Sequence, residues 1–386
     1  MLDFSAVGMT QWMFQEASSQ MLTLSEAVEQ LKQNAHIRTA KETLARYCGA
    51  DAENEGVLKK RLVDLLCQSD LKAKPDSIER KVRMWMKDNV QYIGKRTAIQ
   101  LCYSLHLQVE EADQMLIRLT GERFHWRDPE DIIWCFGLKN NLSYQQACGL
   151  ISNLEENSKA YSPGKPEAVL TEVIKLQALP LHTEKELEAF FEKNWEKLGK
   201  LHNTAYDLFM KFLQLLGLPD SGDFLPAARE MPVKEIVCTY MYKNFIPKAG
   251  DIKEKHKEME NAALLAIQRD IRENWPDEIV LSRMMHRQTD VTRKVLILLF
   301  LACDGGESKY GDYSDEDEEN YFMDALFRIT CMLNDCGFAP LDSRIPFDWM
   351  VLYCLCADES IFVDDNVQRF LSAIFTDGSS VSDEAE

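Results

Sequence analysis

The chain has 386 residues, of which 46% are hydrophobic and 28% are charged, and its formal net charge is -19. This length and composition exclude a short peptide and a low-complexity disordered chain, because there is enough apolar surface to build the core of one or more domains. The sequence contains only 17 glycines and 12 prolines. Few residues therefore oppose helix formation.

The cysteines and the apolar segments indicate a cellular compartment. There are eleven cysteines, an odd number, and most lie in apolar segments, where a free thiol behaves as a small hydrophobic group. This usage is typical of a reducing compartment, and the first twenty residues lack the basic and apolar regions of a secretory signal. The longest apolar run, Val295 to Cys303, has nine residues, about half of a membrane span. We therefore expect a cytoplasmic protein without a membrane span, in which this run is a buried helix.

The spacing of apolar residues predicts the fold class. Apolar residues recur at i, i+3, i+4 and i+7 in 24–31, 98–105, 112–119 and 147–154, which is the pattern of a helix with one buried face. Ser143 with Gln146 and Thr183 with Glu186 fit the capping box, in which the two side chains satisfy free N–H groups of the first helical turn. Alternation typical of strands is hard to find. The sequence therefore predicts an all-α, multi-helical protein.

Breaks in the helical pattern predict the domain organisation. Residues 158–166 are rich in Pro and Gly and separate a domain at 1–157 from a second domain at 167–386. A helical region at 184–216 is interrupted near His202, and residues 304–320 form an acidic loop whose charge and glycines oppose burial. The sequence thus predicts two main domains, the second of them acidic.

The charge of the chain is unevenly distributed. Residues 72–96 hold eight basic and three acidic residues, whereas residues 301–386 hold four basic and twenty acidic residues. On a helix at 77–87, the side chains of Ile78, Val82 and Trp85 fall on one stripe. The opposite face of this helix carries four cations, Arg80, Lys81, Arg83 and Lys87.

The basic helix, the turn that follows it and the two apolar helices after that turn resemble a known family. The order of a basic helix, a turn and the spacing R-x4-L-x3-L-x-L-x3-E-A-x3-L over about 57–120 is similar to the third to fifth helices of lambda-repressor-like, or XRE-type, helix-turn-helix proteins. In that family the third helix enters the major groove of DNA. The resemblance implies that 77–87 is this helix, that Lys95 and Arg96 start a helix facing the phosphate backbone, and that the protein is a prokaryotic regulator binding duplex DNA.

Other interpretations of the same basic face stay open. The face is also explained by contact with solvent, by docking onto the acidic region of its own chain or of a second copy, or by binding of an anionic surface or ligand. Arg80 and Arg83 are able to read guanine, but contact with phosphate is equally easy for them. The main alternative to DNA binding is a helical scaffold that binds another protein.

Motifs that would indicate an enzyme are absent from the sequence. There is no Gly-rich phosphate loop, no Gly-x-Ser-x-Gly and no His-Glu-x-x-His. The seven histidines are scattered, and Cys331, Cys336, Cys354 and Cys356 have no His neighbours at the spacing of a zinc finger. We expect His202 to have a structural role. The sequence therefore predicts a non-enzymatic regulatory or interaction protein without catalytic residues, cofactor or metal. An enzyme whose site has no recognisable motif is the less favoured alternative.

Two distant segments, 121–138 and 337–355, share the pattern Arg-x-Pro-x-Asp before an apolar helical run. Pro suits the first position of a helix, and an Asp two residues later places a carboxylate near the positive end of the helix dipole. The pattern is therefore explained by two similar helix starts. A duplicated helical unit is the alternative, since a glycine and an apolar stretch precede the pattern at similar spacing in both segments.

Overall fold

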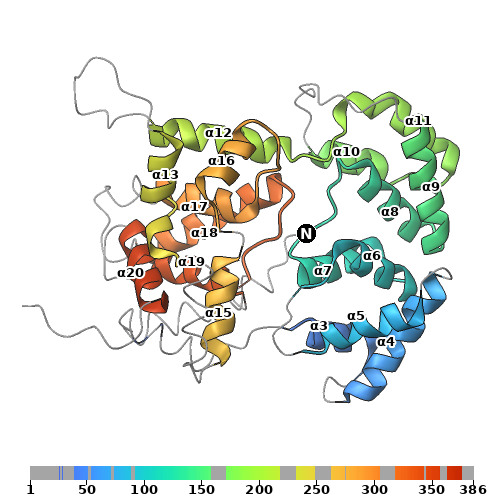
Figure 1. Ribbon diagram of the computed structural model, residues 1–386. Helices are drawn as coiled ribbons and strands as arrows, with labels where there is room; N and C mark the ends of the chain where they lie inside the picture. The colour runs from blue at the N-terminus through green and yellow to red at the C-terminus, as the bar shows by residue number, and fades with distance from the viewer. Residues whose placement is uncertain are drawn as a thin grey trace, which may run out of the picture. The chain divides into compact units, whose positions relative to one another are not determined.

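The protein is described by a computed structural model. The residues whose placement it describes are Glu26, Val28 and the ranges 39–50, 54–70, 74–87, 92–157, 171–217, 232–247, 262–273, 275–304, 318–342, 345–356 and 363–375. Within these residues there are seventeen α-helices, two short 3-10 turns and no β-strand (Figure 1). The predicted all-α, multi-helical fold is confirmed.

The helices form two compact units. The N-terminal unit comprises Arg38–His202 together with Gly337–Ala339. Its elements are α3 (Ala40–Cys48), α4 (Glu55–Ser69), α5 (Pro75–Trp85), α6 (Lys95–Ser104), α7 (Val109–Thr120), α8 (Pro129–Lys139), α9 (Tyr144–Asn157), α10 (Thr171–Ala178), α11 (Glu184–Asn194) and η1 (Trp195–Lys197).

The C-terminal unit contains Asn203–Cys336 and Pro340–Glu386. The linker predicted at 158–166 lies outside the described residues, and the helices on its two sides, α9 and α10, fall in the N-terminal unit. The elements of the C-terminal unit are α12 (Asn203–Gly217), α13 (Val233–Thr239), η2 (Lys243–Phe245), α15 (Ala262–Arg272), α16 (Glu278–Met285), α17 (Arg293–Asp304), α18 (Glu318–Asp335), α19 (Pro346–Cys356) and α20 (Val363–Phe375).

Local sequence signals agree with several of these helices. Ser143 and Gln146 exchange side-chain and backbone hydrogen bonds at the start of α9, as Thr183 and Glu186 do at the start of α11. The apolar run from Val295 is buried in α17, as predicted. The helical region predicted at 184–216 divides into α11 and α12, with η1 and five further residues ending at His202 between them.

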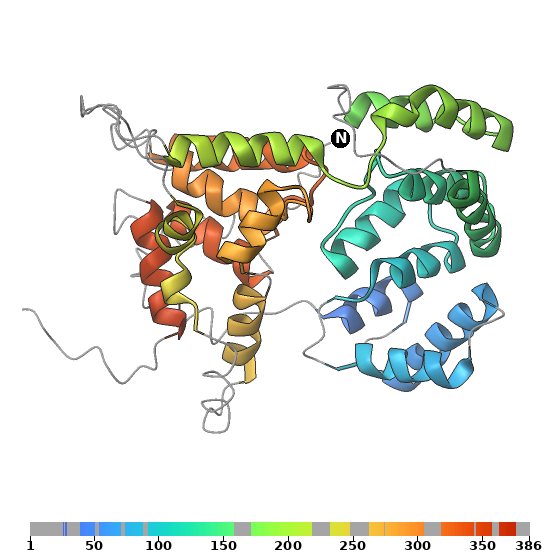
Figure 2. The same ribbon diagram turned by 45° about the horizontal axis from the view of Figure 1, so that its top comes forward.

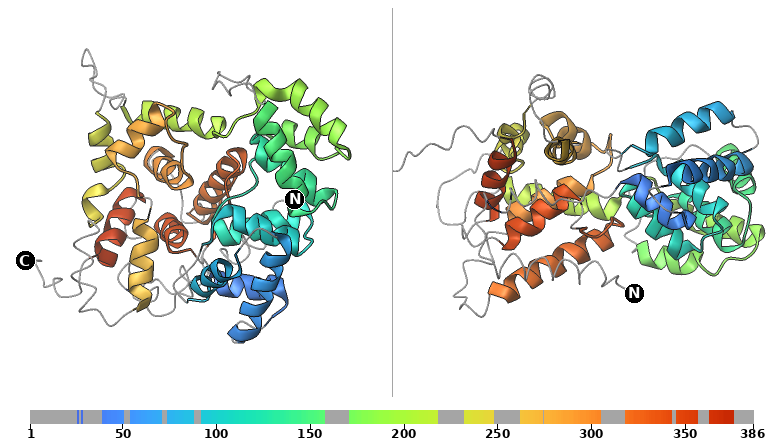
Figure 3. Two further views of the ribbon diagram at one scale, coloured as in Figure 1. Left: turned by 45° about the vertical axis from the view of Figure 1, so that its right-hand side comes forward. Right: turned by 90° about the horizontal axis from the view of Figure 1, so that it is seen from below.

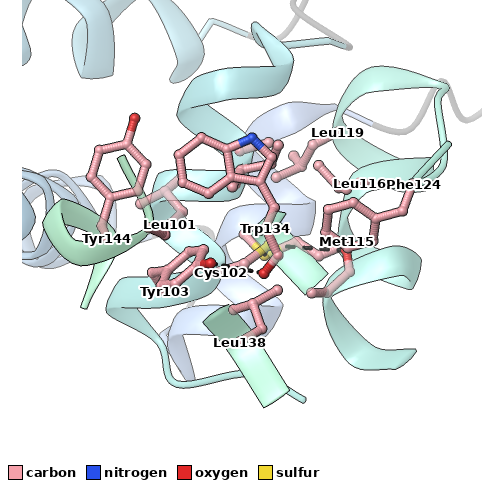
Figure 4. Close-up of a cluster of buried hydrophobic side chains, with 14 of the residues drawn as sticks. Leu101, Cys102, Tyr103, Met115, Leu116, Leu119, Phe124, Trp134, Leu138 and Tyr144 are labelled. Carbon is pink, nitrogen blue, oxygen red and sulfur yellow. Dashed lines mark hydrogen bonds between the residues drawn. The ribbon is translucent and has the colours of Figure 1, made fainter. Parts of the chain in front are cut away.

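The core of the N-terminal unit is built on α6, α7 and α8, and Figure 4 shows the side chains at its centre. Cys102 and Tyr103 of α6 pack with Met115 of α7 and Trp134 of α8, all of them buried. The Trp134 ring stacks on that of Tyr144, with ring centroids 5.3 Å apart. A buried aromatic cluster therefore joins α6, α8 and the first turn of α9.

Gly137, in the last turn of α8, lets two helices approach closely. The Tyr103 hydroxyl donates a hydrogen bond of 2.7 Å to the backbone oxygen of Trp134, a bond drawn as a dashed line in Figure 4. A Cβ atom at residue 137 would overlap the Tyr103 hydroxyl oxygen and lie 3.1 Å from its ring carbon Cζ. Glycine at this position is therefore required by the path of the tyrosine side chain rather than by backbone conformation.

The two Arg-x-Pro-x-Asp segments have the same local structure in the two units. In each, a helix (α7 or α18) is followed by a glycine with positive φ, +72° for Gly121 and +77° for Gly337. The next helix then begins at the proline, which is Pro129 in α8 and Pro346 in α19. The helix starts expected from the sequence are thus present in both segments. Figure 3 shows α17 to α20 of the C-terminal unit from two sides.

The aspartates of these segments make more contacts than a helix start requires. Asp131 accepts the His125 N–H at 2.7 Å and pairs with Lys95, the first residue of α6, at 2.7 Å. Asp348 accepts the Asp342 N–H at 2.8 Å and pairs with Arg293, the first residue of α17. Arg293 donates two hydrogen bonds to the Asp348 carboxylate, at 2.8 and 2.7 Å. The two segments therefore share a backbone hydrogen bond and a long-range ion pair in addition to a helix start.

Candidate nucleic-acid interface

Helix α5 has one buried and one exposed face. Pro75 occupies its first turn, and Ile78, Val82 and Trp85 are buried in the core that α5 shares with the neighbouring helix α4. Figure 2 shows α4 and α5 side by side within the N-terminal unit. Burial of these three apolar side chains fixes which face of α5 is turned to solvent. The exposed residues of α5 and of the turn after it include all four predicted cations, Arg80, Lys81, Arg83 and Lys87.

These four side chains, which we call the α5 basic face, have no ion pair or side-chain hydrogen bond among the described residues. Arg80, Arg83 and Lys87 follow each other at helical spacings of three and four residues, so they form one stripe along the helix. Met84 lies in the same stripe and is 48% exposed. The stripe therefore combines three cations with one apolar side chain, and Lys81 flanks it.

Lys95 does not belong to this face. Its ammonium group pairs with Asp131 at 2.7 Å and with Glu122 at 3.5 Å. Burial disfavours the charged form of Lys95, but attraction to Asp131, Glu122 and Asp128 outweighs it, so the pKa of Lys95 is raised. The Lys95 charge is therefore neutralised by carboxylates of the N-terminal unit, and Lys95 is not part of the candidate interface.

Arg96 is exposed but is held by a specific partner. Its Nε donates a hydrogen bond of 3.3 Å to the hydroxyl of Tyr144. Because the Tyr144 ring stacks on Trp134, the guanidinium of Arg96 is tied to the start of α9. The structure thus separates the six predicted residues into four on the α5 basic face and two on α6 with contacts elsewhere.

An open groove of about 320 Å³ lies between α4 and α5. Cations line it, but the carboxylates of Asp64 and Glu79 line it too, and Lys59 is bonded to Glu55 at 2.8 Å. The mixed charge makes the groove a poor site for an anion. Lys60 and Arg61 of α4 are also exposed, and neither takes part in the Lys59–Glu55 pair. The sequence did not indicate them as interface residues because the predicted basic face was limited to residues 77–96.

A second polar cluster surrounds the start of α8. The buried ring of His125 stacks on the ring of His202, with centroids 3.9 Å apart. Arg127 donates to the backbone oxygen of Lys197 at 2.9 and 2.6 Å, and the Gly199 N–H donates to the Arg127 oxygen at 2.8 Å. We call residues 197–202 the anchored segment. His202, at the end of this segment, is held by stacking on His125.

Two of the cysteines noted in the sequence, Cys336 and Cys354, are buried thiols. None of the ten cysteines whose side chains are described forms a disulfide. Burial raises the pKa of Cys336 to about 12 and also raises the pKa of Cys354, so both thiols stay protonated. In the part of the chain that the structure describes, no group of three or more His, Cys, Asp or Glu side chains is arranged to hold a metal ion.

Among the described residues, no helix has the length and apolar character needed to span a lipid bilayer. Residues 305–317 of the acidic loop lie outside the described residues. No known protein family, curated protein or solved structure matches this chain.

Proposed function

We propose that this protein is a non-enzymatic, cytoplasmic DNA-binding protein whose α5 basic face contacts duplex DNA. The observation that carries the proposal is the exposure of Arg80, Lys81, Arg83 and Lys87 on one helix, without an acidic partner among the described residues. Unpaired cations of this kind release counterions from the phosphate backbone, which drives association with DNA. A prokaryotic regulatory role is part of the proposal through the helix-turn-helix resemblance alone.

The proposal explains why cations gather on an acidic chain. With a net charge of -19, the protein as a whole is repelled by DNA, so binding requires a local surface of opposite sign. Burial of Ile78, Val82 and Trp85 holds the α5 basic face toward solvent. Hydrophobic burial on one side of α5 thus supports the electrostatic role proposed for the other side.

Fluorescence anisotropy of a labelled mixed-sequence duplex, titrated with the full chain at two salt concentrations, tests the proposal. We expect binding that weakens steeply as salt rises, and no binding by a variant with Arg80→Glu, Lys81→Glu, Arg83→Glu and Lys87→Glu. The matched control changes four exposed lysines elsewhere: Lys185→Glu, Lys193→Glu, Lys211→Glu and Lys234→Glu.

The control variant has the same net charge as the α5 variant. If both lose binding equally, overall charge rather than the α5 basic face is responsible. If the α5 variant binds like the unmodified chain, the face is not the interface. Far-UV circular dichroism of both variants checks that helix content is unchanged.

A protein-binding scaffold is the second candidate, and the exposure of Met84 within the cationic stripe favours it. Apolar side chains surrounded by polar ones are common in protein interfaces. A chain that does not bind duplex DNA at low salt would support this alternative. If the chain binds DNA and the charge-reversal variant of the α5 basic face does not, the scaffold alternative is not supported.

A further inference from the structure

We infer that the α5 basic face binds the phosphodiester backbone of duplex DNA without reading its base sequence. This inference rests on the proposed function and specifies its ligand chemistry. It departs from the expectation that α5 enters the major groove, as the third helix does in helix-turn-helix proteins. Three features of α5 and α4 support it.

The first feature is the position of the cations along α5. Helices that read the major groove place their N-terminal residues against base edges. The exposed residues at the N-terminal end of α5 are Pro75, Asp76 and Ser77, followed by Glu79. The cations begin at Arg80 and continue past the last turn to Lys87. If the N-terminal turn entered the groove, Lys87 would lie about 18 Å further along the helix axis and would contribute little to binding.

The second feature is the length of the cationic stripe. Lys87 lies seven positions after Arg80, which corresponds to about 10 Å along a helix. One DNA strand carries a phosphate for every 3.4 Å or so of duplex axis, so a stripe of this length spans about three phosphates. A helix lying along the backbone of one strand brings all the cations of the stripe to phosphates at once. The exposed Lys60 of α4, which lines the groove together with Arg83, adds a cation next to α5.

The third feature is the freedom of the arginine side chains. Bidentate reading of guanine needs a guanidinium in a fixed orientation, usually supported by neighbouring hydrogen bonds. Arg80 and Arg83 have no side-chain hydrogen bond among the described residues, in contrast to Arg96, which Tyr144 holds. Nor does the groove between α4 and α5 offer a fixed recognition pocket for phosphate, because Asp64 and Glu79 line it. Long unsupported cations suit phosphates, whose contacts tolerate variation in geometry.

The test is a binding survey of the full chain by fluorescence anisotropy. Six duplexes of unrelated sequence, including one with only A·T pairs and one with only G·C pairs, are titrated at 50 and 200 mM salt. We expect dissociation constants that agree within about threefold among the duplexes, since phosphate contacts carry no sequence information. With about four phosphates neutralised, affinity is expected to fall about 100-fold between the two salt concentrations.

Single substitutions sharpen the test. Arg83→Ala and Lys87→Ala should each weaken binding to all six duplexes equally and reduce the slope of log affinity against log salt by about one. Lys185→Ala is the matched control, because Lys185 is exposed on α11, and it should leave the slope unchanged. An Arg83→Ala effect confined to duplexes with guanine at one position would overturn the inference.

A selection from a random duplex library separates the inference from the proposed function. We expect no enriched consensus. A selected sequence that binds at least about 1,000-fold more tightly than random duplex, as specific complexes do, would overturn backbone-only binding and leave DNA binding intact. Absence of binding to every duplex at 50 mM salt would overturn the proposed function and the inference with it.

Discussion

Asp131 and Asp348 make equivalent contacts in the two units of the chain. Each accepts an N–H from the residue six positions earlier, and each pairs with the basic residue that starts a helix, Lys95 in α6 and Arg293 in α17. The Asp348 side chain is fully buried, whereas that of Asp131 is 5% exposed. The same ionic connection therefore joins two helices in both units.

Replacing either aspartate should destabilise its unit. We expect Asp348→Asn to lower the free energy of unfolding by about 3 kcal/mol, because it leaves the Arg293 cation without its buried partner. Asp131→Asn should cost somewhat less, since the Lys95 side chain keeps 28% exposure and Glu122 as a second partner. Urea unfolding followed by far-UV circular dichroism measures both changes.

Lys95→Arg is the control for this prediction. If the two units share one arrangement, an arginine at residue 95 reproduces the Arg293–Asp348 pair and should cost less than about 1.5 kcal/mol. Lys95→Met removes the charge and should cost more than Lys95→Arg. Equal losses in these two variants would contradict the equivalence of the two ion pairs.

Gly137→Ala should destabilise the N-terminal unit by about 2 to 3 kcal/mol, because the added methyl group overlaps the Tyr103 hydroxyl in a packed core. Tyr103→Phe alone should cost about 1 kcal/mol through loss of the hydrogen bond to Trp134. In the double variant the penalty of alanine should shrink, since the overlapping oxygen is gone. Thermal unfolding of the four proteins gives the coupling between the two positions.

Gly149→Ala provides a matched control on α9. Nothing lies within 4 Å of a Cβ atom at residue 149, so the alanine should stabilise the chain by about 0.5 to 1 kcal/mol through its higher helix propensity. A loss at Gly149 as large as the loss at Gly137 would show that close packing against Tyr103 is not the cause.

The buried His125 should make the N-terminal unit less stable in mild acid. Burial and the nearby His202, Lys95 and Arg127 lower the pKa of His125 well below its usual value. The unfolded chain therefore binds a proton below about pH 6.5 that the folded chain does not bind, and stability falls as the pH drops through that range. Between pH 6.5 and 5.5 the loss is about 1 kcal/mol for this one group.

His125→Phe tests this pH dependence, because phenylalanine keeps an aromatic ring against His202 but binds no proton. Urea unfolding at pH 7.5, 6.5 and 5.5 should show a smaller acid-induced loss in the variant than in the unmodified chain. Identical pH dependence in the two proteins would exclude His125 as the source.

Asp128 should have the opposite effect on stability. Burial, followed by the charge of Asp131, raises the pKa of Asp128 to about 6. Its charged form is thus disfavoured in the folded state above about pH 6, and this penalty is relieved as the pH falls from 6 toward 4. Asp128→Asn removes the charge and still caps α8 toward the Glu130 N–H. We expect the variant to gain on the order of 1 kcal/mol at pH 7.5 and about a third of that at pH 4.5, as measured by urea unfolding.

Local features of this protein could be predicted from its sequence, and long-range contacts could not. The exposed face of α5, the helix start at Ser143 and the burial of 295–301 all follow from residues within one or two helical turns. Asp131, the partner of Lys95, is 36 residues away in the chain. A charge pattern does not show that a lysine at a helix start pairs with a buried carboxylate of another helix. The prediction that Lys95 and Arg96 face DNA therefore rested on the resemblance alone.

The repeated Arg-x-Pro-x-Asp pattern carried more information than its helix-start interpretation used. A buried aspartate needs a cation or several hydrogen-bond donors. Aspartates at the starts of two apolar helices therefore pointed to partners elsewhere in the fold. The identity of those partners depended on packing between helices, and that packing is what the periodicity of a single helix leaves open.

The anchored segment has a practical consequence for dissecting the chain. Arg127 donates hydrogen bonds to the backbone oxygen of Lys197, Lys200 pairs with Glu130, and His125 stacks on His202. A protease cut or a shortened gene that ends after α11 at Asn194 removes these contacts from the loop before α8. The shortest fragment that keeps the surroundings of Asp131 complete on this side ends at His202.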